Sequence, residues 1–420
     1  MLKELTINNF MSFNEDTVFS MEAEYKRVKE HPSHIVNINN NKLLKIASIY
    51  GPNGGGKSNL LKSIVLLKHL IGRMSQPGIV LNEYTKYIFS KDNIIKLTAF
   101  FVDTEYEIGY SVSFFVNSEK IQSESLFDKN ENRTLPCVFV EEEISFRRNG
   151  EKEFNYLLKR DKTGSVKCDM LVSTVKELPQ IAQSRSIVTK LYDDYANNEY
   201  IKDEAFKVIK HLYEQIDSLT LLAFDQLLNF DPYLLKPVLE KKNDLKKKVI
   251  KLLKSVDIDL DDISFDNKNI YFERCNNGNE LKKIPLRMES TGTIKMLHVF
   301  TFFVLLEKKD TIFLFDDINA YLHPKLCRAI YEWFSSLDSG NSQLIFNSHD
   351  ILNMSKDIFR RDEIYFAYRD EKYSTNIISL SNIFNSYGQP VRRDAVYSKQ
   401  YLEGKYGSDP FIDKGINWND

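Results

Sequence analysis

The sequence predicts an α/β fold: a mixed β-sheet with helices, a smaller antiparallel β subdomain and a mostly helical insertion. Three observations lead to this prediction. An apolar segment at residues 43–50 reads as a buried strand, and a glycine-rich turn and an apolar helix follow it. A second apolar strand at 311–316 ends in two acidic residues. Between them, segments 95–102 and 106–116 alternate like antiparallel strands, and helical periods fill 169–254.

The composition limits the class of protein. The chain has 420 residues, of which 42% are hydrophobic, so it can bury one large domain with an insertion. Its formal net charge of −2 argues against a surface that is basic throughout but leaves room for a local basic patch, so a nucleic acid partner is possible but not indicated. The four scattered cysteines argue against a disulfide framework or a zinc site. With no signal peptide and no apolar run of membrane length, we expect a soluble, cytoplasmic protein without a membrane partner.

The first part of the chain supplies one lobe of the predicted fold. Residues 2–10 alternate like a strand that should pair into the main sheet, whereas residues 22–42, rich in charge and asparagine, read as a loop. The antiparallel strands that begin at residue 95 should continue to residue 126. A hairpin is predicted at 143–156, with an Asn-Gly turn at 149–150.

The rest of the chain returns to the main sheet. A second hairpin is predicted from residues 270–274 and 280–287, and an apolar helix follows at 294–306. The lysine-rich segment 240–254 reads as a solvated helix face, although its lysines could also contact the phosphates of a nucleic acid. We divide the chain into an N-terminal lobe at 1–134, an insertion at 135–280 and a C-terminal lobe at 281–420.

Residues 51–58, GPNGGGKS, fit the phosphate-binding pattern G-x-x-x-x-G-K-[ST]. The glycines let successive backbone N–H groups and the start of the next helix face an anion. In this pattern Lys57 reaches the β- and γ-phosphates, and Ser58 binds Mg²⁺. The sequence therefore predicts a site for ATP and Mg²⁺, with these nucleotide ligands: Asn53, Gly54, Gly55, Gly56, Lys57, Ser58 and Asn59.

A second nucleotide motif lies far downstream and decides the class of P-loop protein. The strand at 311–316 ends in Asp316 and Asp317, the pattern of a Walker B motif, whose first carboxylate helps to bind Mg²⁺. About 260 residues separate it from Lys57. Ring-forming AAA+ motors and small GTPases usually place the two motifs much closer together, whereas the two-lobed ABC/SMC class carries large insertions between them.

Two further motifs meet the demands of the ABC/SMC class. Ser290-x-Gly292 opens the helix before the Walker B strand, as a signature motif does, and His349 follows the apolar strand at 343–347, where a switch histidine belongs. Four motifs in this order predict a P-loop NTPase of the ABC/SMC type. Ser290 and Gly292 cannot reach the ATP of their own subunit in this class, so we expect them to complete the site of a second copy in a head-to-tail ATP-sandwich dimer or a larger oligomer.

The predicted catalytic residues are Lys57, Asp317 and His349, and the predicted metal ligands are Ser58 and Asp316. Asp317 stands where the carboxylate that polarises the attacking water belongs, and His349 would contact the γ-phosphate. ABC-type sites usually have glutamate at the Asp317 position. The aspartate is one methylene shorter, so its oxygen falls back by about 1.5 Å. Because a displacement of about 1 Å can reduce a rate about a hundredfold, we expect slow hydrolysis.

The chain resembles the ABC-type AAA-family ATPases of bacterial abortive-infection and anti-phage operons, the AbiL/RloA group and the PARIS-like ATPase subunit. The matching motifs lie at residues 9–13, 50–59, 289–293, 316–324, 347–350, 360–364 and 401–407. The resemblance is loose over residues 130–280. The family more often has Ala-Asn-Ala-Ser at residues 52–55 and usually has glutamate at 317.

This resemblance implies a nucleotide-gated sensor or scaffold of an anti-phage defence system. It implies an effector partner from the same operon, such as a TOPRIM-type nuclease or another toxin, and a phage protein as a trigger. A DNA-repair ATPase of the RecF or SMC kind is the main alternative. A transporter subunit is disfavoured by the long stretch between Lys57 and Ser290, and a nuclease with its own TOPRIM domain by the short segment after His349.

Overall fold

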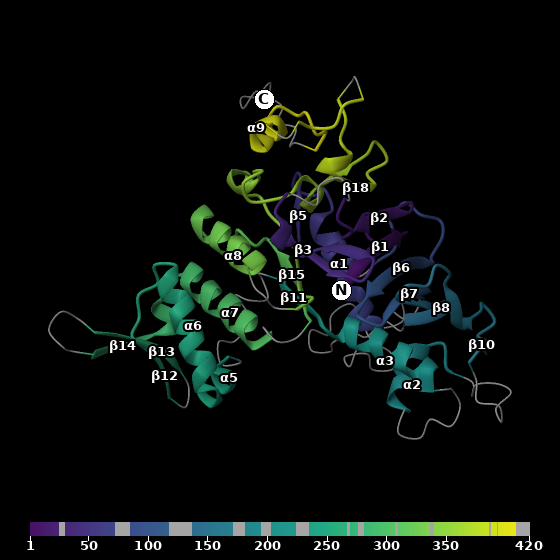
Figure 1. Cartoon of the computed structure of the whole chain (residues 1–420), viewed down its shortest axis with the longest axis horizontal. Coiled ribbons are helices and arrows are strands. Elements are labelled where there is room, and N and C mark those ends of the chain that lie inside the picture. The colour runs from purple at the N-terminus through teal and green to yellow at the C-terminus, as the bar shows by residue number, and fades with distance from the viewer. Residues whose placement is uncertain are drawn as a thin grey trace, which may run out of the picture.

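A computed structural model describes residues 1–24, 30–71, 85–116, 137–170, 181–194, 203–223, 235–266, 269–275, 281–306, 310–336, 340–385, 388–392 and 394–408. It contains a central, mostly parallel sheet and a large antiparallel sheet beside it (Figure 1). On the other side of the central sheet, helices lead to a small unit at the edge of the molecule. No helix among these residues is both long and apolar enough to cross a membrane.

The central sheet carries the predicted nucleotide motifs. Its order is β11 (Leu219–Ala223), β15 (Ile312–Asp316), β16 (Gln343–Asn347), β5 (Ile46–Tyr50), β17 (Ile364–Arg369) and β18 (Thr375–Ser379), and all neighbours are parallel except β17 and β18. The five residues of β5 are all buried because helices cover both faces. Ala47 and Ile49 pack with α1 (Lys57–Ile71), whereas Ile46 and Tyr50 pack with α7 (Thr291–Leu306) and α8 (Pro324–Ser336).

The antiparallel sheet has seven strands in the order β10 (Val166–Cys168), β9 (Asn155–Arg160), β8 (Cys137–Arg148), β7 (Tyr106–Val116), β6 (Ile95–Val102), β1 (Leu2–Asn8) and β2 (Thr17–Ser20). The predicted strands at 95–102 and 106–116 and the turn at 149–150 are confirmed; the predicted continuation from 117 to 126 lies outside the described residues. The prediction that β1 joins the main sheet is wrong, because β1 pairs with β2 and β6. Its alternating burial suits a sheet covered on one face.

Two other predictions of local structure are wrong in part. The predicted loop at 22–42 contains most of a hairpin, β3 (Ile35–Ile38) and β4 (Asn41–Leu44). The predicted helical stretch at 169–254 contains α2 (Ile187–Asp193), α3 (Asp203–Asp217), α5 (Lys236–Lys241) and α6 (Asn243–Ser255), but also strand β11, which pairs with β15. A run of five residues is too short for a sequence period to separate strand from helix, so the partner strand decides.

The range 135–280, which we predict as an insertion, supplies strands to both sheets: β8, β9 and β10 to the antiparallel sheet and β11 to the central one. Its last part contributes β12 (Asp262–Phe265) and β13 (Ile270–Cys275) to a separate three-stranded sheet, which β14 (Leu281–Pro285), just past this range, completes. The strands of the second hairpin are thereby confirmed. Together with α5 and α6, this sheet forms the small unit at the edge of the molecule (Figure 1). The domain boundaries themselves stay a prediction.

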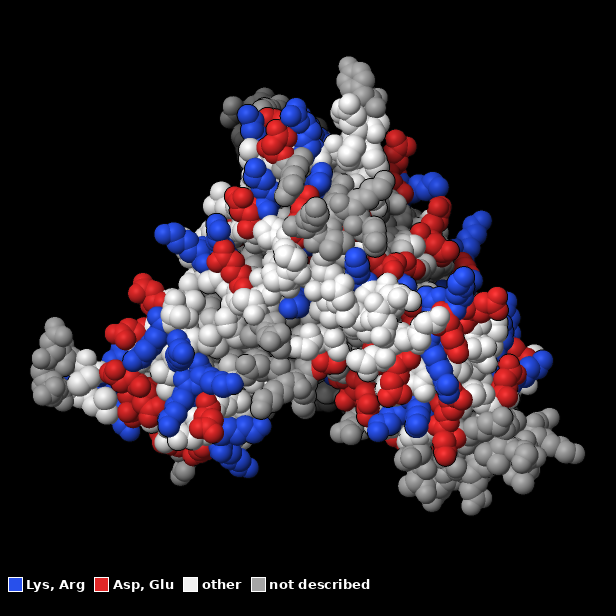
Figure 2. All heavy atoms as spheres, in the orientation of Figure 1, with Lys and Arg blue, Asp and Glu red and all other residues white. Residues whose placement is uncertain are grey.

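Helix α6 follows the prediction of a solvated face. Leu245, Val249 and Leu253 are buried on one side of the helix, and they belong to the same core as the buried residues of α7. Exposed lysines cover the outer side, and Figure 2 shows acidic side chains next to them over α5 and α6. The charges of this face are therefore mixed.

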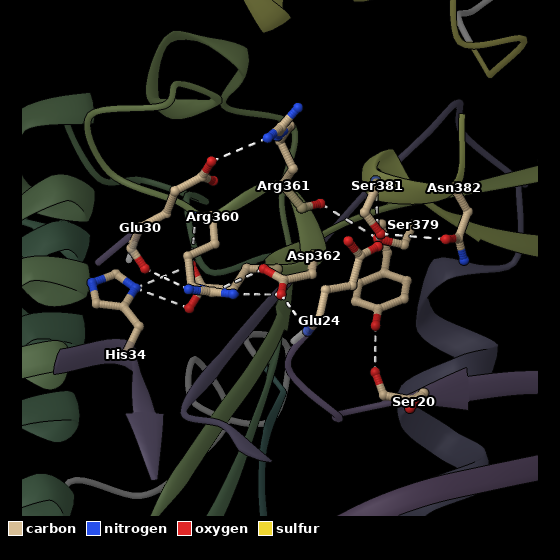
Figure 3. Close-up of polar contacts among 12 residues, drawn as sticks. Ser20, Glu24, Glu30, His34, Arg360, Arg361, Asp362, Ser379, Ser381 and Asn382 are labelled. Carbon is tan, nitrogen blue, oxygen red and sulfur yellow. Dashed lines mark hydrogen bonds and ion pairs between the residues drawn. The ribbon is translucent and has the colours of Figure 1, made fainter. Parts of the chain in front are cut away.

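A buried polar network fixes the start of β17 (Figure 3). The fully buried guanidinium of Arg360 donates to Asp362 with N–O distances of 2.8 and 2.6 Å, and Asp362 also accepts from the backbone N–H of Glu24 at 2.8 Å. His34 Nδ1 lies 2.9 Å from a carboxylate oxygen of Glu363, which is also buried. The motif at 360–364 is therefore structural, because it joins the N-terminal segment to the strand that supports the phosphate-binding loop.

Candidate nucleotide site

The loop between β5 and α1 lies directly against β17 and β18. Gly51 and Gly56 have φ values of +145° and +99°, which L side chains rarely adopt. A Cβ on Gly51 would lie 2.1 Å from the carbonyl oxygen of Ala367, and a Cβ on Gly56 would lie 2.1 Å from Thr375 Oγ1. These two positions therefore require glycine both for conformation and for space.

Hydrogen bonds from residues far apart in the sequence hold this loop in place. Thr375 donates its hydroxyl hydrogen toward Gly55 O at 3.1 Å and lies 2.8 Å from Ser12 Oγ. The side chain of Asn59 donates to the same Ser12 hydroxyl at 2.8 Å. Ser12, within the motif at 9–13, is buried, so that motif supports the loop through hydrogen bonds that the sequence did not reveal.

Lys57, the first residue of α1, is buried over the loop. Its Nζ donates to the carbonyl oxygens of Gly51 and Pro52, both at 2.9 Å. Burial lowers the pKa of Lys57, and the nearby carboxylates of Asp317 and Asp316 oppose that shift. The ammonium thus lies at the loop, where an anion would gain from its charge.

Ser58 and Asp316 meet at the carboxyl end of β15. The Ser58 hydroxyl donates to Asp316 Oδ1 at 2.8 Å, and the side-chain amide of Asn347, at the end of β16, contacts the same oxygen. A hydroxyl and a carboxylate are the oxygen ligands that Mg²⁺ prefers when it keeps several waters and binds phosphates. The Ser58 hydroxyl and the Asp316 carboxylate therefore fit a Mg²⁺ ion. Within the part of the chain that the structure describes, no group of three or more His, Cys, Asp or Glu could hold a metal on its own.

Asp317 and His349 lie next to each other, beside the predicted metal ligands Ser58 and Asp316. His349 Nε2 is 3.9 Å from Asp317 Oδ1, and both side chains are about half exposed. Burial and the carboxylate of Asp316 raise the pKa of Asp317. Burial, and then Lys57, lower the pKa of His349, which favours its neutral form. Asp317 has a left-handed backbone, φ +51°, and its N–H donates to the side-chain oxygen of Asn347.

These side chains line one pocket of about 340 Å³. Its lining residues are Asn53, Gly54, Gly55, Gly56, Lys57, Ser58, Asn59, Asp317, His349 and Arg369. All seven predicted nucleotide ligands are among them, together with Asp317 and His349, and Asp316 contacts Ser58. Arg369 and Asn347 are the members of the site that the sequence analysis missed.

The signature residues lie elsewhere, at the start of α7. Ser290 is exposed, and its hydroxyl oxygen caps the helix by accepting from the backbone N–H of Thr293 at 3.1 Å. A Cβ on Gly292 would lie 2.7 Å from Tyr321 O, so the helix start approaches the loop after β15 closely. Neither Ser290 nor Gly292 lines the nucleotide pocket of its own chain.

One turn further along α7, Lys295 connects this helix with the loop after β15 that carries Asp317. Its Nζ donates to the carbonyl oxygens of three residues of that loop, at 3.0, 2.9 and 3.0 Å: Asp317, Ile318 and Ala320. The side chain is 2% exposed, and burial lowers its pKa to about 8. The sequence carried one signal for it, since a lysine within an otherwise apolar helix needs buried partners.

The fold is similar to that of two SMC head domains of known structure. The chain is similar in structure to the SMC head domain from Thermotoga maritima (12% identity, TM-score 0.43, 90% of this chain and 98% of that one). It is also similar to an SMC head with an extended coiled coil, in complex with the C-terminal domain of ScpA derived from Pyrococcus furiosus (13%, 0.40, 90% and 96%). No curated protein matches the sequence. A family model described as "AAA domain, putative AbiEii toxin, Type IV TA system" matches residues 46–355.

That match runs from β5 to the loop after β16, so it includes the pocket residues 53–59, Asp317 and His349, whereas Arg369 lies beyond it. Together with the sheet topology it confirms the predicted fold class, a P-loop NTPase of the ABC/SMC type with a mixed sheet and an antiparallel β subdomain. The chain belongs to the AAA-domain family of P-loop ATPases that this description defines.

Proposed function

We propose that the chain is an ATP-binding, slowly hydrolysing ATPase that serves as the nucleotide-gated sensor or scaffold of an anti-phage, abortive-infection defence system. One observation carries the ATPase part: the phosphate-binding side chains converge on one pocket, while Ser290 and Gly292 lie outside it. The defence setting is supported by the family description, which refers to an AbiEii toxin and a type IV toxin–antitoxin system, and by the resemblance to abortive-infection ATPases.

The chemistry assigns one task to each residue. Lys57 and the N–H groups of residues 53–59 bind the phosphates, and Ser58 and Asp316 would hold Mg²⁺, which neutralises charge on the β- and γ-phosphates. Asp317 orients the attacking water, and neutral His349 hydrogen-bonds to the γ-phosphate. Because Asp317 is shorter than glutamate, we expect a long-lived ATP-bound state.

The second copy supplies the remaining groups. Ser290 and the N–H of Gly292 are at the exposed start of α7, so they can contact the nucleotide of another chain in a head-to-tail dimer. In such a dimer, two copies enclose two nucleotides, and hydrolysis separates the copies. The change from separate to joined copies is the signal that a partner protein would detect.

We further propose that the partner is an effector encoded in the same operon, a TOPRIM-type nuclease or another toxin, which a phage protein releases. The unit formed by α5, α6 and β12–β14 lies at the edge of the molecule, away from the antiparallel sheet, and leaves a surface for this contact (Figure 1). Apart from β14, it belongs to the range 135–280, which we predict as the partner- or trigger-binding region.

Co-expression with the neighbouring gene product tests this function. We expect pull-down of the partner with Asp317→Asn, which should stay ATP-bound, to exceed that with Lys57→Ala, which should not bind ATP. The pair should protect cells from phage, and Lys57→Ala should remove protection. Protection by this chain alone would exclude the effector hypothesis, and ATP-dependent retention on duplex DNA at physiological salt would favour the RecF/SMC-like alternative.

A further inference from the structure

The order of the central strands gives the nucleotide pocket two distinct ends. On one side of β5 lie β16 and β15, which lead to His349 and Asp317. On the other side lies β17, which ends at Arg369. His349, Asp317 and Arg369 all line the pocket, so it extends across the loop from one flank to the other.

The chemistry orients a nucleoside triphosphate in this pocket. The γ-phosphate must lie at the Asp317 and His349 end, because the attacking water approaches it there. The β-phosphate then lies over the loop, within reach of Lys57. The α-phosphate and the nucleoside are left for the opposite end, which Asn59 and Arg369 line.

Arg369 is held at that end by a braced hairpin. It pairs in register with Thr375, whose side chain contacts the loop at Gly55. Asp370 orders the turn by accepting from the backbone N–H groups of Lys372 and Ser374 at 2.9 and 2.8 Å. The hydroxyl of Tyr87 also donates to Lys372 O.

The guanidinium of Arg369 is suited to an anion. It is exposed, and no carboxylate among the described residues forms an ion pair with it. A planar guanidinium binds phosphate oxygens with two parallel N–H donors, which gives it an advantage over lysine at such sites. Lys57 serves the β/γ end of the pocket, and Arg369 supplies the cation at the other end.

We propose that Arg369 binds the α-phosphate of the nucleotide. The inference rests on the proposed ATPase function and adds a phosphate ligand that comes from β17, outside the four nucleotide motifs. It predicts that Arg369 stabilises ATP and ADP by the same factor, since both retain the α-phosphate.

Binding measurements on the full chain test this assignment. ATP, ADP and inorganic tripolyphosphate, each with Mg²⁺, are titrated into the parent protein and into Arg369→Ala, and the Kd of each ligand is measured. We expect about a tenfold to hundredfold weaker Kd for all three ligands, the effect of losing hydrogen bonds to a charged group. Lys372→Ala is the matched control, because it removes a cation from the same hairpin. Lys372 lies 3.7 Å from Glu15 and does not line the pocket. It should bind like the parent.

The other outcomes each overturn the assignment. A larger loss for ATP than for ADP would place Arg369 at the γ-phosphate. Unchanged binding of tripolyphosphate with weaker ATP would place it at the nucleoside, and parent-like binding of all three ligands would remove it from the site. Lys57→Ala separates the two proposals, because a failure of that variant to weaken ATP binding would refute the proposed function itself.

Discussion

The two halves of the predicted ATPase machinery differ in how the fold treats them. The phosphate half is assembled within one chain: the buried Lys57, and Ser58, Asp316 and Asn347 in mutual contact at the ends of adjacent elements. The signature half, Ser290 and Gly292, is at a helix start where Ser290 is exposed and caps its own turn, and where Gly292 lies close to Tyr321 O in the loop after β15. The phosphate half is thus preorganised in a single copy, whereas the signature half lies outside the nucleotide pocket of its own chain.

This difference teaches that binding and hydrolysis have separate requirements. A preorganised set of donors can bind phosphates without any partner. In the proposed dimer, the exposed signature acts when a second chain brings a nucleotide to it. We therefore expect one copy to bind ATP and two copies to hydrolyse it. Substitutions of Lys57 and of Ser290 each change one half while leaving the other intact.

The largest effect should come from the phosphate half. Lys57→Ala removes the buried cation of the loop, so we expect at least about a hundredfold weaker ATP binding in calorimetry, with the melting temperature of the protein retained. Ser290→Arg blocks the exposed signature of the other half. It should bind ATP like the parent and lose ATPase activity.

A mixture of these two variants sharpens the comparison. In a dimer of one Lys57→Ala chain and one Ser290→Arg chain, one site has both defects and the other has neither. Activity should therefore reappear on mixing, at no more than half of the parent rate for each dimer. Normal hydrolysis by Ser290→Arg alone would show that the signature assignment is wrong.

The next effect concerns the carboxylate at the border between the two halves. Asp317→Asn should reduce the turnover rate about a hundredfold or more, since a general base contributes about 10²–10⁴ in rate, and it should retain ATP-dependent association. Asp317→Glu should raise the rate, because the longer side chain places its oxygen nearer the water. Single-turnover assays measure both. Turnover of the asparagine variant at the parent rate would remove Asp317 from the mechanism.

The sequence predicted the half that is contiguous in the chain better than the contacts that the fold creates. Residues 51–58 form one local motif, so pattern and spacing were sufficient to predict the loop. Asn347 and Arg369 reach the same pocket from β16 and β17, and only the strand order brings them there. Lys295 was missed for the same reason, because its three acceptors belong to a loop that follows a different strand. Strand β11 lacked any periodic signal, since pairing with β15 defines it.

A moderate effect should follow from loosening the contact between the halves. Lys295→Met removes three hydrogen bonds to the catalytic loop. We expect about a tenfold lower turnover rate with unchanged ATP affinity, because the loop that carries Asp317 would be less well positioned. Lys325→Met, an exposed lysine on α8, is the control and should behave like the parent.

The pH dependence of the ATPase rate is a second test of the role of Lys295. Its pKa is lowered to about 8, so the parent should lose activity as the pH rises past that value and the ammonium loses a proton. Lys295→Met has no proton to lose, and its rate profile should lack this basic limb. The same basic limb in Lys295→Met as in the parent would show that another group titrates.

The smallest effect should come from a change that touches neither half. His211 on α3 lies 2.7 Å from Asp103 Oδ2 beside the antiparallel sheet, and this hydrogen bond raises the pKa of His211 above its usual 6.5. A raised histidine pKa means that the folded protein holds the proton more tightly, so the stabilisation is complete below pH 6.5 and is lost as the pH rises through the folded-state pKa. His211→Gln should therefore reduce the free energy of unfolding by on the order of 1 kcal/mol at pH 6 and by less at pH 8.

Lys210→Gln, on the exposed side of the same helix, is the control for denaturation at both pH values. ATP affinity should stay at the parent value throughout, and equal destabilisation at pH 6 and pH 8 would show that the ion pair does not contribute.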